Sequence, residues 1–271
     1  MPGESIGPPD GRGHSCGVFF PISDDNRERM SPAWVCIGLL VANVVMFMIQ
    51  LHDPSFTYGW SVIPYEITHH LDLREPIHDW HHNIVMPQAP GPHPIYLTVL
   101  SAMFMHGGWM HIGGNMLYLW IFGDNVEHRF GALRFLRFYL ISGIVATIAQ
   151  IATDPNSLIP NLGASGAISG VLGAYIVLFP RNRVNAIFFF RIISLPAVVV
   201  IGMWALLQFV NGAGSITDHH AGGGVAYAAH IGGFIAGVAM GIYERMKMKN
   251  HEPPSEFRKI YEEEPGVRKY W

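Results

Sequence analysis

The chain has 271 residues, of which half are hydrophobic, and its mean hydropathy is +0.25. Charged residues make up only 14% of it, against roughly 25% in an ordinary soluble domain, so the composition excludes disorder and disfavours a water-soluble globule. The net charge of −3 gives no sign of nucleic-acid binding, and the two cysteines, Cys16 and Cys36, allow one disulfide at most.

Residues 1–33 are polar and rich in Gly and Pro, without a secretory signal, so we expect a cytoplasmic N-terminal tail and a retained first span. A spanning helix needs about 20 mostly apolar residues. Six runs come near this length, and the second and fourth look compressed or partly re-entrant: 34–51, 95–122, 138–153, 164–179, 192–209 and 221–243. The sequence therefore predicts an all-α polytopic membrane protein, with a six-transmembrane helical bundle over residues 34–243.

The distribution of Lys and Arg predicts how this bundle is oriented. With six spans and an inside N-terminus, 16 of the 17 basic residues fall in the two tails and the second and fourth loops. Only Arg74 falls in an outer loop, although the first outer loop is long. Because this asymmetry sets orientation, we expect N-in/C-in topology, with residues 244–271 as a charged, loosely ordered cytoplasmic tail.

Four polar residues stand out within the apolar runs, where such groups suggest a functional site. Ser165 stands at the start of the fourth span, in Gly163-Ala164-Ser165-Gly166, and His230 lies in the middle of the sixth. His111 and Asn115 are four residues apart on the second, so they share a helix face. Each alone is explained by packing or by a hydrogen bond across helices. Together they supply a hydroxyl, a base and oxyanion donors, which nucleophilic catalysis needs.

Small residues at four-residue spacing predict which spans touch. Gly237 and Gly241 lie on the His230 face of the sixth span, while Ser169 and Gly173 follow Ser165 on the fourth. Faces of small residues let two helix backbones approach closely. We therefore expect the fourth and sixth spans to pack together and bring Ser165 within reach of His230; a dimerising face is the alternative.

These motifs resemble those of the rhomboid intramembrane serine proteases over about residues 32–243. The matching segments are 106–115 (HGGWMHIGGN), 163–166 (GASG) and 229–237 (AHIGGFIAG), with 122–127 and Gly131 after the second span. The resemblance implies a serine endopeptidase that cleaves transmembrane segments near the outer face. It implies Ser165 as nucleophile, His230 as general base, and His111 and Asn115 as oxyanion donors beside the Ser165 N–H. The implied supporting residues are His106, Gly163, Gly166, Gly233 and Gly237.

One position departs from the family pattern. Many rhomboids place a Tyr one turn after the nucleophile, stacked on the catalytic His, and here that position is Ser169. What orients His230 is therefore left open, and Ser169 is an alternative nucleophile. Because Ser169 lacks a Gly two residues earlier and would lie a turn deeper, the pattern favours Ser165.

The remaining histidines do not form a metal motif. His69, His70, His78, His81, His82, His93, His219 and His220 crowd the outer loops, with no HExxH pattern or nearby Cys, so we interpret them as solvated. His106 and His111 are five residues apart, and on a regular helix they would point about 140° away from each other. We expect no metal and no cofactor.

We expect a multi-pass protein of a prokaryotic inner membrane, whose partners are the bilayer and transmembrane protein substrates and not nucleic acid. Three other functions fit the same polar residues. They are an inactive rhomboid-like protein that binds membrane clients, a polytopic carrier or channel, and a bis-histidine haem protein.

Overall fold

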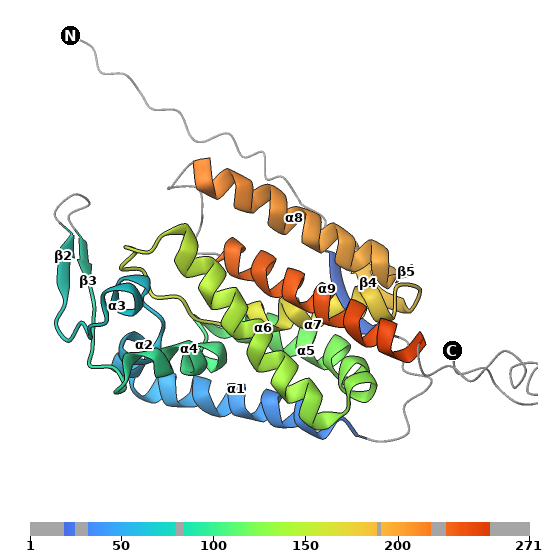
Figure 1. The fold of residues 1–271 in the computed structure, drawn as a ribbon, viewed down its shortest axis with the longest axis horizontal. Coiled ribbons are helices and arrows are strands. Elements are labelled where there is room, and N and C mark those ends of the chain that lie inside the picture. Colours follow the sequence, from blue (N-terminus) through green and yellow to red (C-terminus); the bar gives the residue numbers. More distant parts are fainter. Residues whose placement is uncertain (1–18, 25–31, 80–83, 189–190, 218–225, 250–271) are drawn as a thin grey trace, which may run out of the picture.

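The computed structural model describes residues 19–24, 32–79, 84–188, 191–217 and 226–249, and this part of the chain is mostly helical. Its long helices run alongside one another, with α1 and α8 at opposite margins (Figure 1). They are α1 (Trp34–His52), α5 (Trp109–Phe130), α6 (Ala132–Thr153), α7 (Ser165–Leu178), α8 (Ala197–Thr217) and α9 (Tyr227–Lys249).

Short elements between α1 and α5 gather at one end of the bundle (Figure 1). They are α2 (Pro54–Trp60), α3 (Pro64–His69), the antiparallel hairpin of β2 (Ile77–Asp79) and β3 (Ile84–Met86), the 3-10 turns η1 (Ile95–Leu97) and η2 (Ala102–Phe104), and α4 (Thr98–Ser101). Asp53 begins α2 by accepting a hydrogen bond from the Ser55 N–H, and Pro54 follows it at the first helical position, where a missing N–H costs nothing.

A three-stranded antiparallel sheet lies at the other end (Figure 1), in the order β1 (Phe19–Asp24), β4 (Arg183–Phe188), β5 (Arg191–Pro196). The expectation of an all-α protein is therefore wrong in this part. Residues 192–196, expected at the start of the fifth span, belong to β5, because apolar content alone does not distinguish a strand from a helix. β1 lies within the expected N-terminal tail.

The observed helices shift several of the expected bounds. The second span is interrupted before Trp109 as expected, but α5 continues to Phe130, and α6 already begins at Ala132. α9 begins at Tyr227 and continues to Lys249, past the expected end at 243; residues 218–225 and 250–271 lie outside the described residues. Within the described ranges, α1 and α6 are long and apolar enough to cross a membrane, and shorter apolar helical segments cover 95–104, 165–178 and 197–213.

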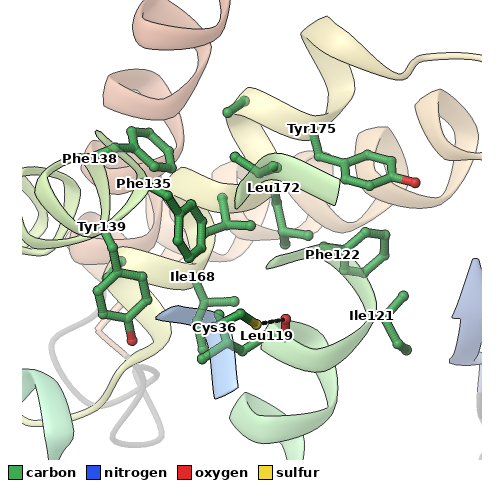
Figure 2. Close-up of a cluster of buried hydrophobic side chains, with 14 of the residues drawn as sticks. Cys36, Leu119, Ile121, Phe122, Phe135, Phe138, Tyr139, Ile168, Leu172 and Tyr175 are labelled. Atoms are coloured by element: carbon green, nitrogen blue, oxygen red, sulfur yellow. Dashed lines mark hydrogen bonds between the residues drawn. The ribbon is translucent and has the colours of Figure 1, made fainter. Parts of the chain in front are cut away.

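The core surrounds α7, in which every residue from Gly166 to Tyr175 is buried. Aromatic side chains from α5, α6 and α7 fill this core (Figure 2), and the Cys36 thiol of α1 donates a hydrogen bond to the Leu119 carbonyl. With 14 residues, α7 is about 21 Å long, shorter than a hydrocarbon layer of about 30 Å. The helices α5, α6 and α9 pack around it.

Glycines bring α7 and α9 into backbone contact, which confirms the predicted packing of these two segments. A Cβ atom on Gly237 would overlap the carbonyl of Gly170, and one on Gly233 would overlap the carbonyl of Gly166. The contact row on α7 is Gly166, Gly170 and Gly173: Gly173 was expected, whereas Gly166 and Gly170 take the places expected for Ser165 and Ser169. The Ser165 side chain is therefore left beside the contact and not inside it.

Candidate active site

The polar residues singled out in the sequence come together at the starts of three helices. His111 is the third residue of α5, Ser165 the first of α7 and His230 the fourth of α9. The expectation that His230 lies in the middle of its span is thus wrong, because the described helix begins six residues later than the apolar run. First-turn positions place the side chains beside backbone N–H groups that have no acceptor within their own helix.

Ser165 and His230 are in hydrogen-bonding contact. The Ser165 Oγ lies 2.8 Å from the His230 Nε2, and the His230 Nδ1 lies 2.8 Å from the Gln208 Oε1 of α8. Because an amide oxygen only accepts, Nδ1 carries the ring proton and Nε2 is free to accept from the serine hydroxyl. The predicted proximity of Ser165 and His230 is confirmed, and their chemical roles stay predictions.

His111 and Asn115 both offer a donor on the same side of α5. The Gly107 N–H lies 3.2 Å from the His111 Nδ1 and donates to it, so the proton of the neutral ring is on Nε2. Asn115 is buried, and its Nδ2 has no hydrogen-bond partner within the described residues. A buried donor without a hydrogen-bond partner lowers the stability of the fold. Such a donor is typical of a site in which a bound ligand supplies the acceptor.

A cavity of about 530 Å³ joins these groups. Its polar wall holds all four residues of the predicted catalytic set, and an apolar wall continues from it along α5, α7 and α8. The main lining residues are His111, Asn115, Ser165, Ser169, His230, Met110, Tyr118, Leu162, Ile168, Leu172 and Trp204. The cavity can hold an extended stretch of peptide with apolar side chains beside the serine.

Gly163 shapes the loop that delivers Ser165. Its φ of +135° is in the region that favours glycine, and a Cβ there would lie 2.9 Å from His111 Cε1. The Gly163 N–H donates to the Ala102 carbonyl at 2.9 Å, which ties the loop to η2. A side chain at residue 163 would therefore displace the His111 ring.

Ser169, the alternative nucleophile, has a different environment. It is 1% exposed, and its hydroxyl donates to the Ser165 carbonyl at 2.6 Å. This hydroxyl is one turn deeper than the Ser165 hydroxyl, and the imidazole hydrogen bond goes to Ser165. The geometry thus agrees with the preference for Ser165 drawn from the sequence.

His106 lies beside His111, contrary to the expected 140° separation, with ring centroids 5.2 Å apart. The helical argument fails because His106 precedes α5, which begins at Trp109. Gln50 of α1 holds this turn: its Oε1 accepts from the His106 N–H at 2.8 Å, and its Nε2 donates to the His106 carbonyl at 3.2 Å.

Three glutamines around the site were missed by the sequence reasoning. Gln50 holds the His106 turn, Gln150 accepts a hydrogen bond from the Ala229 N–H at 3.2 Å, and Gln208 contacts His230. Each lies near the outer end of an expected span, the first, third and fifth. The repeated occurrence of Gln near these span ends was the only sequence feature that could have pointed to the three residues. An uncharged amide neither titrates nor acts as a nucleophile, so the search for catalytic residue types did not select it.

The outer histidines form no metal site in the part of the chain that the structure describes. No group of three or more His, Cys, Asp or Glu side chains there could hold an ion. His69 stacks on Tyr65, and His70 hydrogen bonds to the Tyr96 hydroxyl. His81, His82, His219 and His220 lie outside the described residues.

Comparisons with known proteins agree on one family. The family model described as "Rhomboid domain" matches residues 94–247. "Rhomboid protein 1, mitochondrial" of Saccharomyces cerevisiae is 32% identical over 151 residues, which are 54% of this chain and 41% of that protein. "Rhomboid protease GluP" of Bacillus subtilis is 35% identical over 148 residues, 53% of this chain and 26% of the relative. "Putative rhomboid protease YdcA" of the same bacterium is 32% identical over 115 residues, 42% and 55% of the two chains. The matched segments thus cover only part of each relative.

Proposed function

The chain belongs to the rhomboid family, and from this premise we propose that it is an intramembrane serine endopeptidase. In this proposal Ser165 and His230 form a catalytic dyad that cleaves transmembrane segments of membrane proteins near the outer face. The observation that carries it is the 2.8 Å contact between Ser165 Oγ and His230 Nε2 at the wall of the cavity. Two of the related proteins are named as rhomboid proteases, one of them as putative.

The reaction follows the logic of a serine protease. As the Ser165 Oγ attacks the scissile carbonyl, its proton moves to the His230 Nε2, and a tetrahedral oxyanion forms. When the C–N bond breaks, Nε2 gives this proton to the leaving amine, and an acyl ester remains on Ser165. A water molecule then gives its proton to His230 and attacks the ester, which releases the carboxylic acid and restores the serine hydroxyl.

The oxyanion is assigned to three donors. The Ser165 N–H is at the first position of α7, where it has no acceptor within the helix and where the helix dipole favours negative charge. His111 Nε2–H and Asn115 Nδ2 supply the others, because both line the cavity and both have a proton to donate. Preorganised donors of this kind stabilise the charge that develops in the transition state.

The membrane arrangement in the proposal has six spans, α1, α5, α6, α7, α8 and α9, with both termini inside. Successive spans then alternate in direction, so α5, α7 and α9 all begin on the outer side, together with His111, Ser165 and His230. The relatives include mitochondrial and bacterial proteins; we retain the prokaryotic inner membrane as part of the proposal. The substrates are membrane-spanning proteins, and no cofactor takes part.

Labelling by a serine-directed fluorophosphonate, combined with cleavage of a single-span test substrate in proteoliposomes, tests this function. We expect wild type to be labelled and active. Ser165→Ala and His230→Ala should each abolish cleavage, and the double variant should be no worse than either, because residues that act as one unit are strongly non-additive. Ser169→Ala should keep substantial activity.

Three other outcomes would contradict this assignment, and each would favour a different alternative. Cleavage by Ser165→Ala but not by Ser169→Ala would move the nucleophile by one turn. Wild-type protein that is folded and monodisperse, yet neither labelled nor active, would instead favour client binding or transport through the same cavity. A Soret band in the purified protein would indicate haem.

A further inference from the structure

We infer that Gln208 is the positioning residue that orients His230 and fixes its tautomer, an inference that rests on the proposed function of the dyad. The His230 ring is held at both nitrogens. Ser165 Oγ lies 2.8 Å from Nε2, and Gln208 Oε1 lies 2.8 Å from Nδ1. Gln208 therefore occupies the place that a carboxylate has in a three-residue serine protease site.

The chemistry of the amide explains why this contact matters. A neutral imidazole has one donor and one acceptor nitrogen, and a general base toward Ser165 needs Nε2 unprotonated. An acceptor on Nδ1 favours the tautomer with the proton there. Without this acceptor, the Nε2–H tautomer competes, and in it the ring cannot take a proton from the serine.

An amide oxygen also differs from a carboxylate. It orients the ring by hydrogen bonding, but it carries no full charge to stabilise the imidazolium that forms when His230 takes the proton. Hydrogen bonds to ionised groups are roughly twice as strong as neutral ones. Gln208 thus gives the dyad orientation with little added basicity.

The fold holds Gln208 on the face of α8 that meets α9. Trp204, Gln208 and Gly212 follow one another at four-residue spacing, so they share one face of the helix. The Trp204 ring centroid lies 6.2 Å from that of His230. At Gly212 an added Cβ would lie 3.1 Å from Ile231 Cδ1 and 3.3 Å from Tyr227 Cβ, so glycine lets α8 come close beside His230.

This face of α8 provides the contacts that orient the His230 ring, which Ser169 does not provide. The Ser169 hydroxyl is engaged with the Ser165 carbonyl at 2.6 Å, and its short side chain offers no ring to stack on His230. The indole of Trp204 and the amide of Gln208 contact His230 from the neighbouring helix instead. The ring is thus positioned from α8, in addition to its hydrogen bond with Ser165 of α7.

Two substitutions at residue 208 test the inference in the full-length protein in proteoliposomes. Gln208→Leu removes the acceptor at similar size, and we expect kcat to fall by about 10- to 100-fold with KM unchanged, the scale set by misplaced catalytic groups. Gln208→Glu keeps the acceptor and adds charge. It should restore much of kcat and move the acidic limb of the pH–kcat/KM profile to higher pH, because a carboxylate beside the ring favours the imidazolium. Leu206→Ala, on an exposed side of α8, is the matched control.

A spectroscopic reading separates this inference from the proposed function. In detergent-solubilised protein with ¹⁵N-labelled histidine, the His230 resonances should report an Nδ1–H tautomer in wild type and a shift toward Nε2–H in Gln208→Leu. An unchanged tautomer, a wild-type kcat in Gln208→Leu, or an unshifted pH profile in Gln208→Glu would overturn the role of Gln208. Absence of labelling and cleavage in wild type would overturn the proposed function alone, since the tautomer is still measured.

Discussion

In the proposed mechanism, one residue of the site carries the proton and others are fixed hydrogen-bond donors. His111 is held by the Gly107 N–H so that its Nε2 carries a proton, while Asn115 keeps a buried Nδ2 without a partner among the described residues. Neither donor is charged, so each gives a modest interaction with the substrate carbonyl and a stronger one with an oxyanion. The benefit therefore appears in the transition state more than in substrate binding.

Removing these donors should lower kcat with little effect on KM. Loss of one oxyanion donor costs about 10²–10³ in kcat in a well-studied soluble protease. We expect a smaller loss for Asn115→Ala, because His111 and the Ser165 N–H share the charge, and a larger loss for His111→Ala/Asn115→Ala. Steady-state cleavage of the single-span substrate measures both, with fluorophosphonate labelling of wild type as the reference. A fully active double variant would remove both residues from the mechanism.

Residue types with titration or nucleophilic chemistry were predictable from the sequence, and neutral amides were not. Ser165, His230, His111 and Asn115 could be selected because polar groups are rare in apolar runs. Gln208 could not be assigned to His230, because that contact depends on how α8 is rotated and how closely Gly212 lets it approach α9. Two of the three contact positions on α7, Gly166 and Gly170, differ by one residue from the expected Ser165 and Ser169 for the same reason: sequence spacing gives the period of a helix face, but not which face meets the neighbour.

At the level of elements, the strand β1 connects the segment before α1 to the helix that carries Ser165. The Tyr175 hydroxyl of α7 donates to Asp24 Oδ2 at 2.6 Å, and Asn125 Nδ2 of α5 donates to the same oxygen at 2.6 Å. Burial, reinforced by the nearby Asp124 charge and opposed by the Tyr175 hydrogen bond, raises the pKa of the Asp24 carboxyl to about 6. The sheet end of the bundle thus contains an acid whose ionisation is unfavourable in the folded state.

This acid should make stability fall as pH rises. The pKa of Asp24 in the folded state, about 6, lies above the ordinary value of 3.8. The contribution of neutral Asp24 to the free energy of unfolding is therefore fully present below about pH 4 and is lost as the pH rises through about 6. Asp24→Asn keeps acceptors for Tyr175 and Asn125 but does not titrate. Thermal unfolding in detergent should show wild type losing stability relative to Asp24→Asn between about pH 4 and pH 7. Parallel curves over this range would contradict a buried, titrating Asp24.

Apolar content predicts the helix α1 correctly but also predicts a helix at residues 192–196, where the structure has a strand. α1 was predicted with its start correct and its end one residue short, because a charge-free apolar run of that length favours a spanning helix over a strand or a loop. Residues 192–196 were placed in a helix, yet they pair with 183–187 as strand β5. β1 and β4 pair residues that are 160 to 169 positions apart, and no local pattern in a tail and a short loop predicts such a pairing.

For the whole molecule, the opposite ends of the bundle differ in a way that matches the charge distribution. The β1–β4–β5 sheet lies at one end, and the β2–β3 hairpin lies at the other (Figure 1). Two basic residues of the expected fourth loop, Arg183 and Arg191, belong to β4 and β5. Because α5 and α7 meet β1 through Asn125 and Tyr175, near their C-terminal ends, their first turns lie away from the sheet. The start of α9 lies beside that of α7, through the contact of His230 with Ser165. If Lys and Arg set the orientation, the sheet faces the cytoplasm and the cavity opens toward the outer half of the membrane.

Cysteine accessibility in intact cells tests this orientation without truncating the chain. Cys36 is buried, so a Cys16→Ser background leaves little labelling of its own. Glu75→Cys, exposed between α3 and β2, should react with a membrane-impermeant maleimide in intact cells, because the proposed topology puts its loop on the outer side. Ser194→Cys, exposed on β5, should react only after lysis, because the proposed topology puts the sheet on the inner side. Neither change alters a basic residue, so the charges that set the orientation are kept. The proposed arrangement has three membrane crossings between α3 and β5, namely α5, α6 and α7, so the two positions lie on opposite sides. Reaction of both positions from the same side would require an even number of crossings and would reject the arrangement.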